Sequence, residues 1–426
     1  MNDNNILAII LSEVKLKILE NSKINIKIQT LSTEKSLNRV SAINVYSNVN
    51  YPAANNTSFD GYAINSKDTI FLNQKKIKLF KIIKTIAAGD NPKISNIKKF
   101  QTVEVMTGAL IPKPFDTVIP IEQIKFYPSN KVKKYILIDK KISKNNHIRF
   151  KGSDFKKKEL IISKGEIVQP QHILAFKSLG IKKIKVMSKP NILFFSTGNE
   201  ISEKNKINDW QVRNSNSYYI KSLSKNFLFN FIDGGLLKDK DNLLFEKKLN
   251  KSLNSKIDII ITSGAVSAGK FDFVPSIIKK FKLTSFFKGV SIRPGKPILF
   301  AKFKNKQKCF FGLPGNPISS AACFRFFVYP YVCNILGLQK EKPFKAILKK
   351  DFEKKKKFTR FLKAKLISTK NGTLEVEILT GQEAFRIKSF IKSNVWAILK
   401  SGKSLFKKGQ LIECFSPISS NKNIFY

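Results

Sequence analysis

The chain has 426 residues and carries 78 Lys and Arg against 30 Asp and Glu, which gives a formal net charge of +48 and an isoelectric point near 10.1. This length allows two to four domains, each with its own hydrophobic core. Only seven of the basic residues are Arg, and Ile, Asn and Phe are also abundant, which indicates an A/T-rich genome that places Lys on solvated faces. Because no basic motif with interleaved aromatic residues appears, we expect no specific nucleic-acid partner, while the positive surface would attract anionic substrates.

The cysteines and histidines give no metal or disulfide signature. No two of the four cysteines have Cys-x-x-Cys spacing and the two histidines are far apart, which argues against zinc sites, iron–sulfur sites and disulfides. The sequence shows no secretory leader and no apolar run of about 18 residues, so we expect a cytoplasmic protein without a membrane partner.

The first 190 residues predict a mixture of short elements. Residues 6–21 have apolar positions at helical spacing, and the alternating residues 23–31 predict a strand. From Thr69 to about Lys140, short β-type runs alternate with turns, which predicts a small β domain. A helix within 169–180 is expected to end at Gly180.

Two strands of the middle region end in the same way. The apolar run 192–195 leads into Ser196-Thr197-Gly198, and the run 257–261 leads into Thr262-Ser263-Gly264. Such endings predict the carboxyl edge of one parallel α/β sheet, where open sheets usually bind their ligands. Free backbone amides and hydroxyl groups in these loops indicate an anion site.

A third amide cluster follows in the segment GLPGNP, residues 312–317. Asn316 can cap a helix and Pro317 fits its first turn, ahead of an apolar run that extends to about Leu336. A Lys-rich stretch with Pro343 then marks a boundary, and the last 80 or so residues have the pattern of strands. The predicted fold class is therefore a multidomain α/β plus β protein with a central doubly wound α/β domain flanked by smaller β-rich domains.

Three segments together carry a family resemblance. Each is weak evidence alone, but TSGAVSAGKFD (262–272), RPGKP (293–297) and GLPGNP in this order and spacing resemble the molybdenum cofactor biosynthesis family, in particular its molybdenum-inserting MoeA branch, which is related to the gephyrin E domain. The segment FDGYA (59–63) is similar to the MDGYA signature of that family. Further matches at VMTGALIP, HIRFKGSDF and STGNE extend the resemblance over nearly the whole chain.

The resemblance implies molybdopterin molybdenumtransferase activity. Adenylylated molybdopterin and molybdate would bind as substrates together with Mg²⁺, the adenylyl phosphoanhydride would be cleaved, and molybdenum would enter the dithiolene, leaving molybdenum cofactor and AMP. It further implies a homodimer whose cleft joins the α/β domain of one subunit to the DGYA-bearing domain of the other, with a molybdopterin adenylyltransferase as upstream supplier.

The resemblance also implies a division into domains. A discontinuous N-terminal α/β segment (1–45 and 141–175) would hold a β-rich inserted domain (46–140), followed by the molybdopterin-binding α/β domain (176–336) and a C-terminal β-barrel (343–426).

The candidate site has two halves. Carboxylates would meet Mg²⁺, which prefers carboxylate and phosphate oxygen, and amides, hydroxyls and cations would hold the anionic substrate. The catalytic candidates are Asp60, Asp154, Glu200, Asp239 and Asp272, and all of these except Asp154 are also candidate metal ligands. The substrate-binding candidates are Thr107, Gly108, Thr197, Gly198, Ser215, Asn216, Ser263, Gly264, Ser267, Lys288, Arg293, Lys296, Pro314, Gly315, Asn316 and Lys363.

The chain departs from the family pattern at several acidic positions. Ser153 replaces a Glu, Asn199 and Asn214 replace Asp residues, and Lys240 replaces the second Asp of a pair. These changes remove negative charge around one site and bear on its metal affinity. Lys363 replaces an Arg, which keeps a positive charge without the bidentate fork.

Two other functions compete with this interpretation. The sister activity, molybdopterin adenylyltransferase, shares the α/β domain, but the flanking β regions and the DGYA segment argue against it. A basic nucleic-acid-binding protein belongs to another class, and steeply salt-dependent retention of DNA or RNA would support it.

Overall fold

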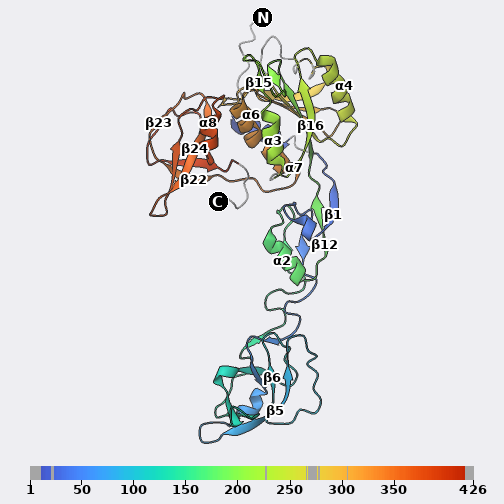
Figure 1. Ribbon diagram of the computed structural model, residues 1–426, viewed down its shortest axis with the longest axis vertical. Helices are drawn as coiled ribbons and strands as arrows, with labels where there is room; N and C mark the ends of the chain where they lie inside the picture. Colours follow the sequence, from blue (N-terminus) through green and yellow to red (C-terminus); the bar gives the residue numbers. More distant parts are fainter. Residues whose placement is uncertain are drawn as a thin grey trace.

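The computed structural model describes residues 11–20, 24–225, 228–264, 279–304 and 306–417, together with Val266 and Ser276. The molecule is elongated (Figure 1): an α/β part and a C-terminal β part lie side by side at one end, a β-rich part lies at the other, and a narrow segment joins the two ends. The predicted first helix is present as α1 (Leu11–Glu20), and its first five predicted residues lie outside the described ranges. In the part of the chain that the structure describes, no helix is long and apolar enough to cross a membrane.

The β-rich end is one six-stranded sheet in the order β7-β4-β6-β5-β9-β8. Its interior is filled by buried apolar side chains such as Tyr62, Phe80 and Ile136, since alternate positions of each strand face the core. The elements are β4 (Gly61–Ile64), β5 (Lys78–Ile86), β6 (Gln101–Val105), β7 (Thr117–Pro120), β8 (Lys125–Pro128), β9 (Lys133–Ile138) and the 3₁₀ turns Ser66–Thr69 and Ile121–Gln123.

The narrow segment is made by two passes of the chain, one before and one after the β-rich sheet. Three antiparallel ladders join the passes, and helix α2 (Pro170–Ser178) packs on them and ends before Gly180, whose φ is +72°. The ladders pair β1 (Ile28–Ser32) with β12 (Lys183–Met187), β2 (Val45–Tyr46) with β11 (Leu160–Ile162), and β3 (Asn56–Thr57) with β10 (Ile148–Arg149), and a 3₁₀ turn covers Glu34–Ser36.

The central sheet has six strands in the order β16-β13-β17-β21-β20-β18. The first four run parallel, as predicted, but β20 is antiparallel to both neighbours, so the sheet is mixed. Helix α4 covers one face and helices α3, α6 and α7 the other, which confirms a doubly wound arrangement. The elements are β13 (Asn191–Thr197), β16 (Asn230–Leu237), β17 (Ile259–Ser263), β18 (Leu283–Lys288), β20 (Leu299–Phe303), β21 (Cys309–Leu313), α3 (Asn216–Ser224) and α4 (Asn242–Leu253), with the small ladder β14 (Ile201–Ser202) and β15 (Val212–Arg213) beside them.

The helix predicted after GLPGNP runs through the middle of this part. It consists of α6 (Pro317–Cys323), a widened π turn (Phe324–Val328) and α7 (Tyr329–Ile335). Pro330 has no N–H to donate to the carbonyl four residues earlier, and the widened turn accommodates this break. Nearly all of its side chains are buried, so the helix packs on its whole circumference.

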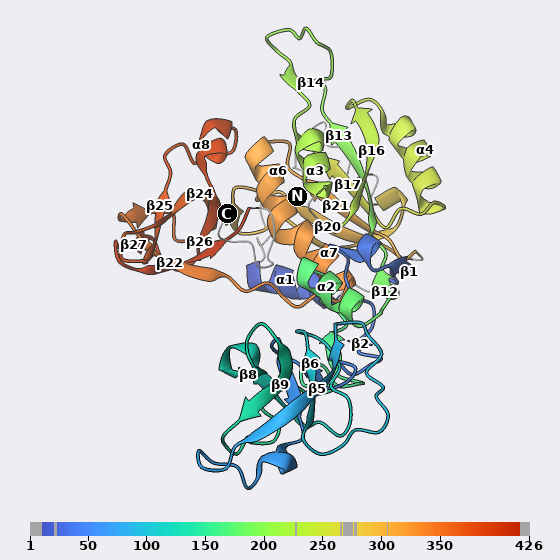
Figure 2. The same ribbon diagram turned by 60° about the horizontal axis from the view of Figure 1, so that its bottom comes forward.

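The C-terminal part is a closed barrel. Its five main strands form the cycle β24-β25-β22-β28-β26-β24, and closure leaves no free edge between them. Strand β19 (Ile292–Arg293), which comes from the central part, adds to β24. The elements are β22 (Phe344–Leu348), β23 (Phe352–Glu353), β24 (Thr359–Ser368), β25 (Leu374–Ile378), α8 (Ile387–Lys392), β26 (Val395–Leu399), β27 (Leu405–Phe406) and β28 (Leu411–Phe415). Figure 2 shows the barrel beside the central sheet from a second direction.

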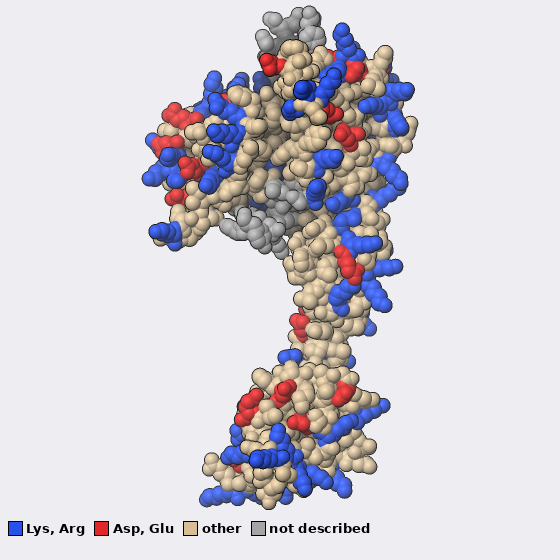
Figure 3. Space-filling model, in the orientation of Figure 1, with Lys and Arg blue, Asp and Glu red and all other residues tan. Residues whose placement is uncertain are grey.

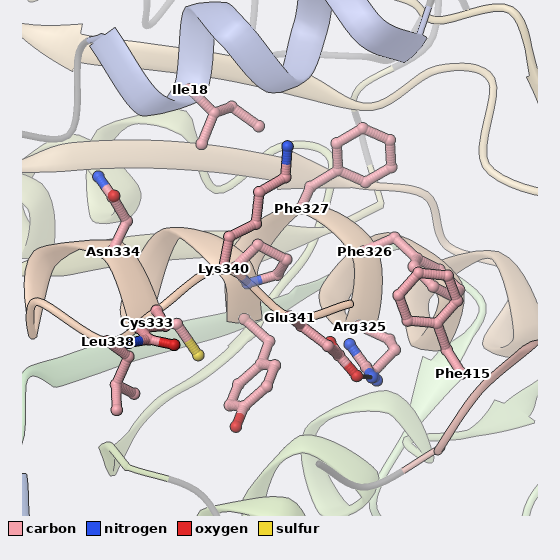
Figure 4. A pocket seen from close by; sticks show the side chains of 13 residues that line it. Ile18, Arg325, Phe326, Phe327, Cys333, Asn334, Leu338, Lys340, Glu341 and Phe415 are labelled. Atoms are coloured by element: carbon pink, nitrogen blue, oxygen red, sulfur yellow. Dashed lines mark hydrogen bonds and ion pairs between the residues drawn. The ribbon is translucent and has the colours of Figure 1, made fainter. Parts of the chain in front are cut away.

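The barrel and the central helix share one core. Phe326 of the π turn stacks on Phe361 of β24 with ring centroids 4.3 Å apart. Arg325, 2% exposed, donates from Nε to the carbonyl of Ser416 and pairs through Nη2 with Glu341 at 2.6 Å. Arg325, Phe326 and Glu341 line a cavity of about 100 Å³, to which Ile18 of α1 also contributes (Figure 4). A charge buried this deeply depends on its partner.

We therefore expect Glu341→Gln to destabilise the junction of barrel and helix by about 3 kcal/mol, because it leaves the buried guanidinium without a counter-charge. A lowered urea midpoint measured by tryptophan fluorescence would show this, since Trp396 lies against Phe326 in the same core. The matched control is Glu377→Gln, which breaks the partly exposed ion pair with Lys349 and should change the midpoint much less. Equal midpoints for both variants would contradict the expectation.

Candidate functional site

A cleft of about 580 Å³ lies where the strands β13, β17 and β21 end. Their carboxyl ends meet at one edge of the sheet because the three strands are parallel neighbours. The lining residues come from the strand-end loops, the start of α3 and α6, and one loop of the barrel. They include the predicted residues Glu200, Ser215, Asn216, Ser263, Gly264, Pro314, Gly315 and Asn316.

The Asn216 side chain ties the strand ends together. Its Nδ2 donates to Ser263 Oγ at 2.7 Å and to the Gly315 carbonyl at 2.8 Å, and the residue is only 8% exposed. Thr197 Oγ1 donates to the Ser263 carbonyl at 3.1 Å, and the Gly264 amide donates to Leu313. The loops after all three strands are thus fixed relative to one another.

Gly264 and the residues around it leave no space for a side chain. The φ of Gly264 is +104°, and a Cβ atom there would lie 2.4 Å from the Thr197 carbonyl oxygen. The loop after β17 can therefore cross the end of β13 only because position 264 is glycine. Asn316 is the residue before α6, as predicted, but its side chain makes no capping hydrogen bond.

Two predicted carboxylates belong to adjoining loops beside the cleft. Glu200 lines it, and the Asp239 amide donates to Asn199 Oδ1 at 3.0 Å, which places the two acidic loops side by side. Lys238 joins the same loops, since its Nζ donates to the carbonyls of Asn199 at 2.9 Å and Ile201 at 2.5 Å. Sequence analysis did not identify Lys238, although its position next to the candidate residue Asp239 could have indicated a role near the cleft.

Two hydrogen bonds explain why position 214 carries an amide side chain. Ser196 Oγ donates to its Oδ1 at 2.8 Å, and its Nδ2 donates to Glu203 Oε1 at 2.8 Å. An Asp at this position would have no donor for Glu203 and would repel its charge. Sequence analysis did not identify Glu203 either. The only signal was the Asn at position 214 in place of the family's Asp, which indicates that another carboxylate lies nearby.

Cations gather where β19 meets the barrel. Arg293 is exposed, and its Cζ lies 4.7 Å from the centre of the Phe358 ring. Arg360 is its ladder partner on β24, and burial together with the neighbouring Arg293 lowers the pKa of the Arg360 guanidinium. The sequence did not predict this pairing. Lys296 is exposed in the same loop, and Lys288 ends β18.

Asp60 has a well-defined environment in the β-rich sheet. Its Oδ1 accepts hydrogen bonds from the Thr107 amide at 2.6 Å and from Thr107 Oγ1 at 2.8 Å. These bonds lower the pKa of Asp60, so the carboxylate is charged at neutral pH. The Gly108 amide donates to Thr57 and closes the loop. Three predicted residues thus come together, but at the opposite end of the molecule from the cleft (Figure 1).

The other predicted carboxylates are dispersed. Asp154 lies in the narrow segment, where its amide donates to the Tyr51 carbonyl. Asp272 and Ser267 lie outside the described residues. Among the described residues no three His, Cys, Asp or Glu side chains form a group that could hold a metal. The described part of one chain therefore does not bring Asp60, Asp154 and Glu200 together in one place.

Lys363 fixes a loop in this structure. The residue is 1% exposed, and its Nζ donates to the carbonyls of Gly381 at 2.6 Å, Glu383 at 3.1 Å and Arg386 at 3.1 Å. Burial lowers the pKa of its ammonium group. All three ammonium hydrogens are thus directed to the loop that carries Phe385, another lining residue of the cleft.

Comparison with known families assigns most of the chain to three family regions. Residues 4–180 match the model of the MoeA N-terminal region (domain I and II), residues 194–334 match the probable molybdopterin binding domain, and residues 345–415 match the MoeA C-terminal region (domain IV). These three regions follow one another in the order expected from the sequence motifs.

Individual relatives agree with the family models. The chain is 31% identical over 389 residues to a molybdopterin molybdenumtransferase of Staphylococcus aureus (strain COL), covering 90% of each chain, and 30% identical over 406 residues to that of Haemophilus influenzae, covering 94% of this chain and 97% of the relative. A solved molybdopterin biosynthesis MoeA protein from Pyrococcus horikoshii superimposes with a TM-score of 0.79 at 27% identity, covering 96% of this chain and 99% of that one. The chain belongs to the MoeA family of molybdopterin molybdenumtransferases.

Proposed function

We propose that the protein inserts molybdenum from molybdate into adenylylated molybdopterin and releases AMP. The observation that carries this proposal is the cleft in which Asn216 joins Ser263 to Gly315, because it offers amides and hydroxyl groups at the carboxyl edge of the family's molybdopterin-binding sheet. Fixed polar groups of this kind stabilise charge that develops on a phosphoryl group without reorganising.

The chain's own residues would bind and orient both anions. The loops at Thr197, Ser263 and Gly315 would hold the phosphate and pterin groups, while Arg293 and Lys296 supply the positive charge. In this proposal the dithiolene itself supplies the sulfurs. None of the four cysteines, all of which the structure describes, lines the cleft, and burial raises the pKa of all four cysteine thiols.

Mg²⁺ fits the loops beside the cleft. Mg²⁺ is usually held by one or two carboxylates together with substrate phosphates, and Glu200 and Asp239 lie on adjoining loops. The ion would neutralise charge on the phosphoanhydride as it breaks. Asn199 would orient the Asp239 loop through the hydrogen bond to its amide.

We further propose a homodimer with shared sites. The Asp60 carboxylate is charged and accepts hydrogen bonds from Thr107. It belongs to the β-rich end of the molecule, which is remote from the cleft (Figure 1), and the neighbouring residue Phe59 is 49% exposed. A second copy that brings its Asp60 loop over the cleft would complete the carboxylate set. In this proposal the protein works in the cytoplasm and receives its substrate from a molybdopterin adenylyltransferase.

The alternative functions have less support. A molybdopterin adenylyltransferase needs only the α/β part, whereas this chain also matches the family's N-terminal and C-terminal regions. Lys and Arg form separate groups on the upper, middle and lower parts of the face in Figure 3, with Asp and Glu among them, so the net charge gives no defined track for nucleic acid.

The substitution Gly264→Ala should lower molybdate-dependent release of AMP roughly a hundredfold, because the new Cβ would push the loop after β17 away from Thr197. The assay uses adenylylated molybdopterin, molybdate and Mg²⁺. Gly402→Ala is the matched control: its φ of +92° carries the same backbone strain, but a Cβ there meets nothing within 4 Å. Similar losses in both variants would mean that backbone strain, and not the cleft, limits activity.

Mixing two inactive variants tests the shared site. Asp60→Asn and Asp272→Asn should each abolish AMP release, and co-refolding them should restore part of it. In a mixed dimer with shared sites, one cleft carries both substitutions and the other carries neither. If Asp60 acted within its own chain, every cleft of a mixed dimer would carry one lesion and no activity would return.

A further inference from the structure

Phe385 is an aromatic ring left in water at a ligand cleft. It lines the cleft beside the Ser263 and Gly315 loops, although it belongs to the barrel, and 64% of the residue is exposed. Because this ring lines a cleft and does not stand on open surface, its exposed face is accessible to a ligand bound there. The sequence motifs did not point to this residue.

The loop that presents the ring is held by an extensive hydrogen-bond network. Lys363 donates three bonds to its carbonyls, and Gln382 Nε2 donates to the carbonyls of Lys363 at 2.8 Å and Leu379 at 2.7 Å. The Ile318 amide of α6 donates to the Ala384 carbonyl at 3.1 Å, which fixes the loop to the start of α6, beside the lining residue Pro317. The ring is therefore presented by a preorganised loop, so little ordering cost remains for binding.

The surroundings of the ring indicate the chemistry of its ligand. Arg386 lies over the ring with Cζ 5.7 Å from its centre and is held by Glu383 at 3.0 Å. Val212 and Pro297 give the cleft apolar walls, while its floor is polar. The same loop borders a second hollow of about 640 Å³ that contains the cations Arg386, Lys388 and Lys392. A flat heteroaromatic ring joined to phosphate would offer a π face to Phe385 and negative charge to these cations.

We propose that Phe385 is the stacking platform for a bicyclic heteroaromatic ring of the substrate, either its purine or its pterin. This inference rests on the proposed function and deepens it, because it names the residue that selects for the ring while the strand-end loops hold the phosphates. Aromatic side chains bind bases in this way through the π face that every such ring presents.

The test measures dissociation constants of the full chain by calorimetry for AMP, for 6-carboxypterin and for ribose 5-phosphate, which lacks a ring. Phe385→Ala should weaken binding of AMP, or of 6-carboxypterin, about tenfold and leave ribose 5-phosphate unchanged. Phe385→Tyr should restore the affinity. The ring ligand that responds identifies whether purine or pterin stacks there.

Ile387→Ala is the matched control, because Ile387 is 56% exposed near the same loop but is not among the residues that line the cleft. Its affinities should equal those of the wild type. Unchanged affinity of Phe385→Ala for both ring ligands would overturn the proposal. An equal loss of affinity for ribose 5-phosphate would also overturn it, because it would mean that the substitution displaces the whole loop.

Two further outcomes are distinguished. If sedimentation shows that Phe385→Ala only dissociates an oligomer, without a loss selective for ring ligands, the ring serves a subunit contact and the proposal is wrong. If the wild type binds neither ring ligand, the stacking platform is excluded. Failure of the wild type to release AMP in the presence of molybdate would instead refute the proposed function itself.

Discussion

The side-chain amide of Asn216 is the contact on which the cleft depends. It reaches both Ser263 and Gly315, so one buried group connects the ends of two parallel strands, and Thr197 connects the third. A buried amide that lost these acceptors would keep unsatisfied donors, which costs more than the bonds contribute. The geometry is stable because separating the loops would leave several polar groups without partners at once.

Buried and half-buried lysines have a comparable role in fixing loops elsewhere. Lys238, Lys308 and Lys363 each direct the ammonium group at backbone carbonyls of a loop. Burial lowers the pKa of Lys308 and Lys363, but three donors to carbonyl oxygens compensate the lost hydration. In a chain with so many lysines, some have thus become structural donors, and the net charge overstates what is available to ligands.

The sequence predicted the features that depend on local chemistry. Glycine and proline residues in the sequence predicted the strand ends, the start of α6 at Pro317 and the end of α2 before Gly180, because local backbone conformation determines where these elements begin and end. The antiparallel strand β20 and the register of β19 on β24 were not predicted, since contacts between distant segments decide them. The partners of Lys363 and Asn214 were not predicted for the same reason. The charge of Lys363 suggested a substrate ligand, whereas its ammonium group binds loop carbonyls, and the Asn214 amide binds Glu203.

The strand β19 makes the barrel part of the central fold. Arg293 belongs to a loop of the central part but forms its ladder with Arg360 of the barrel, and Phe326 and Phe361 fill the common core. A chain shortened before Pro343 would expose that core and leave Arg293 without its neighbouring strand. Loss of the barrel in evolution would therefore require another way to position the Arg293 side chain. We expect the central α/β part and the barrel to be inherited together and to move between proteins only as one unit.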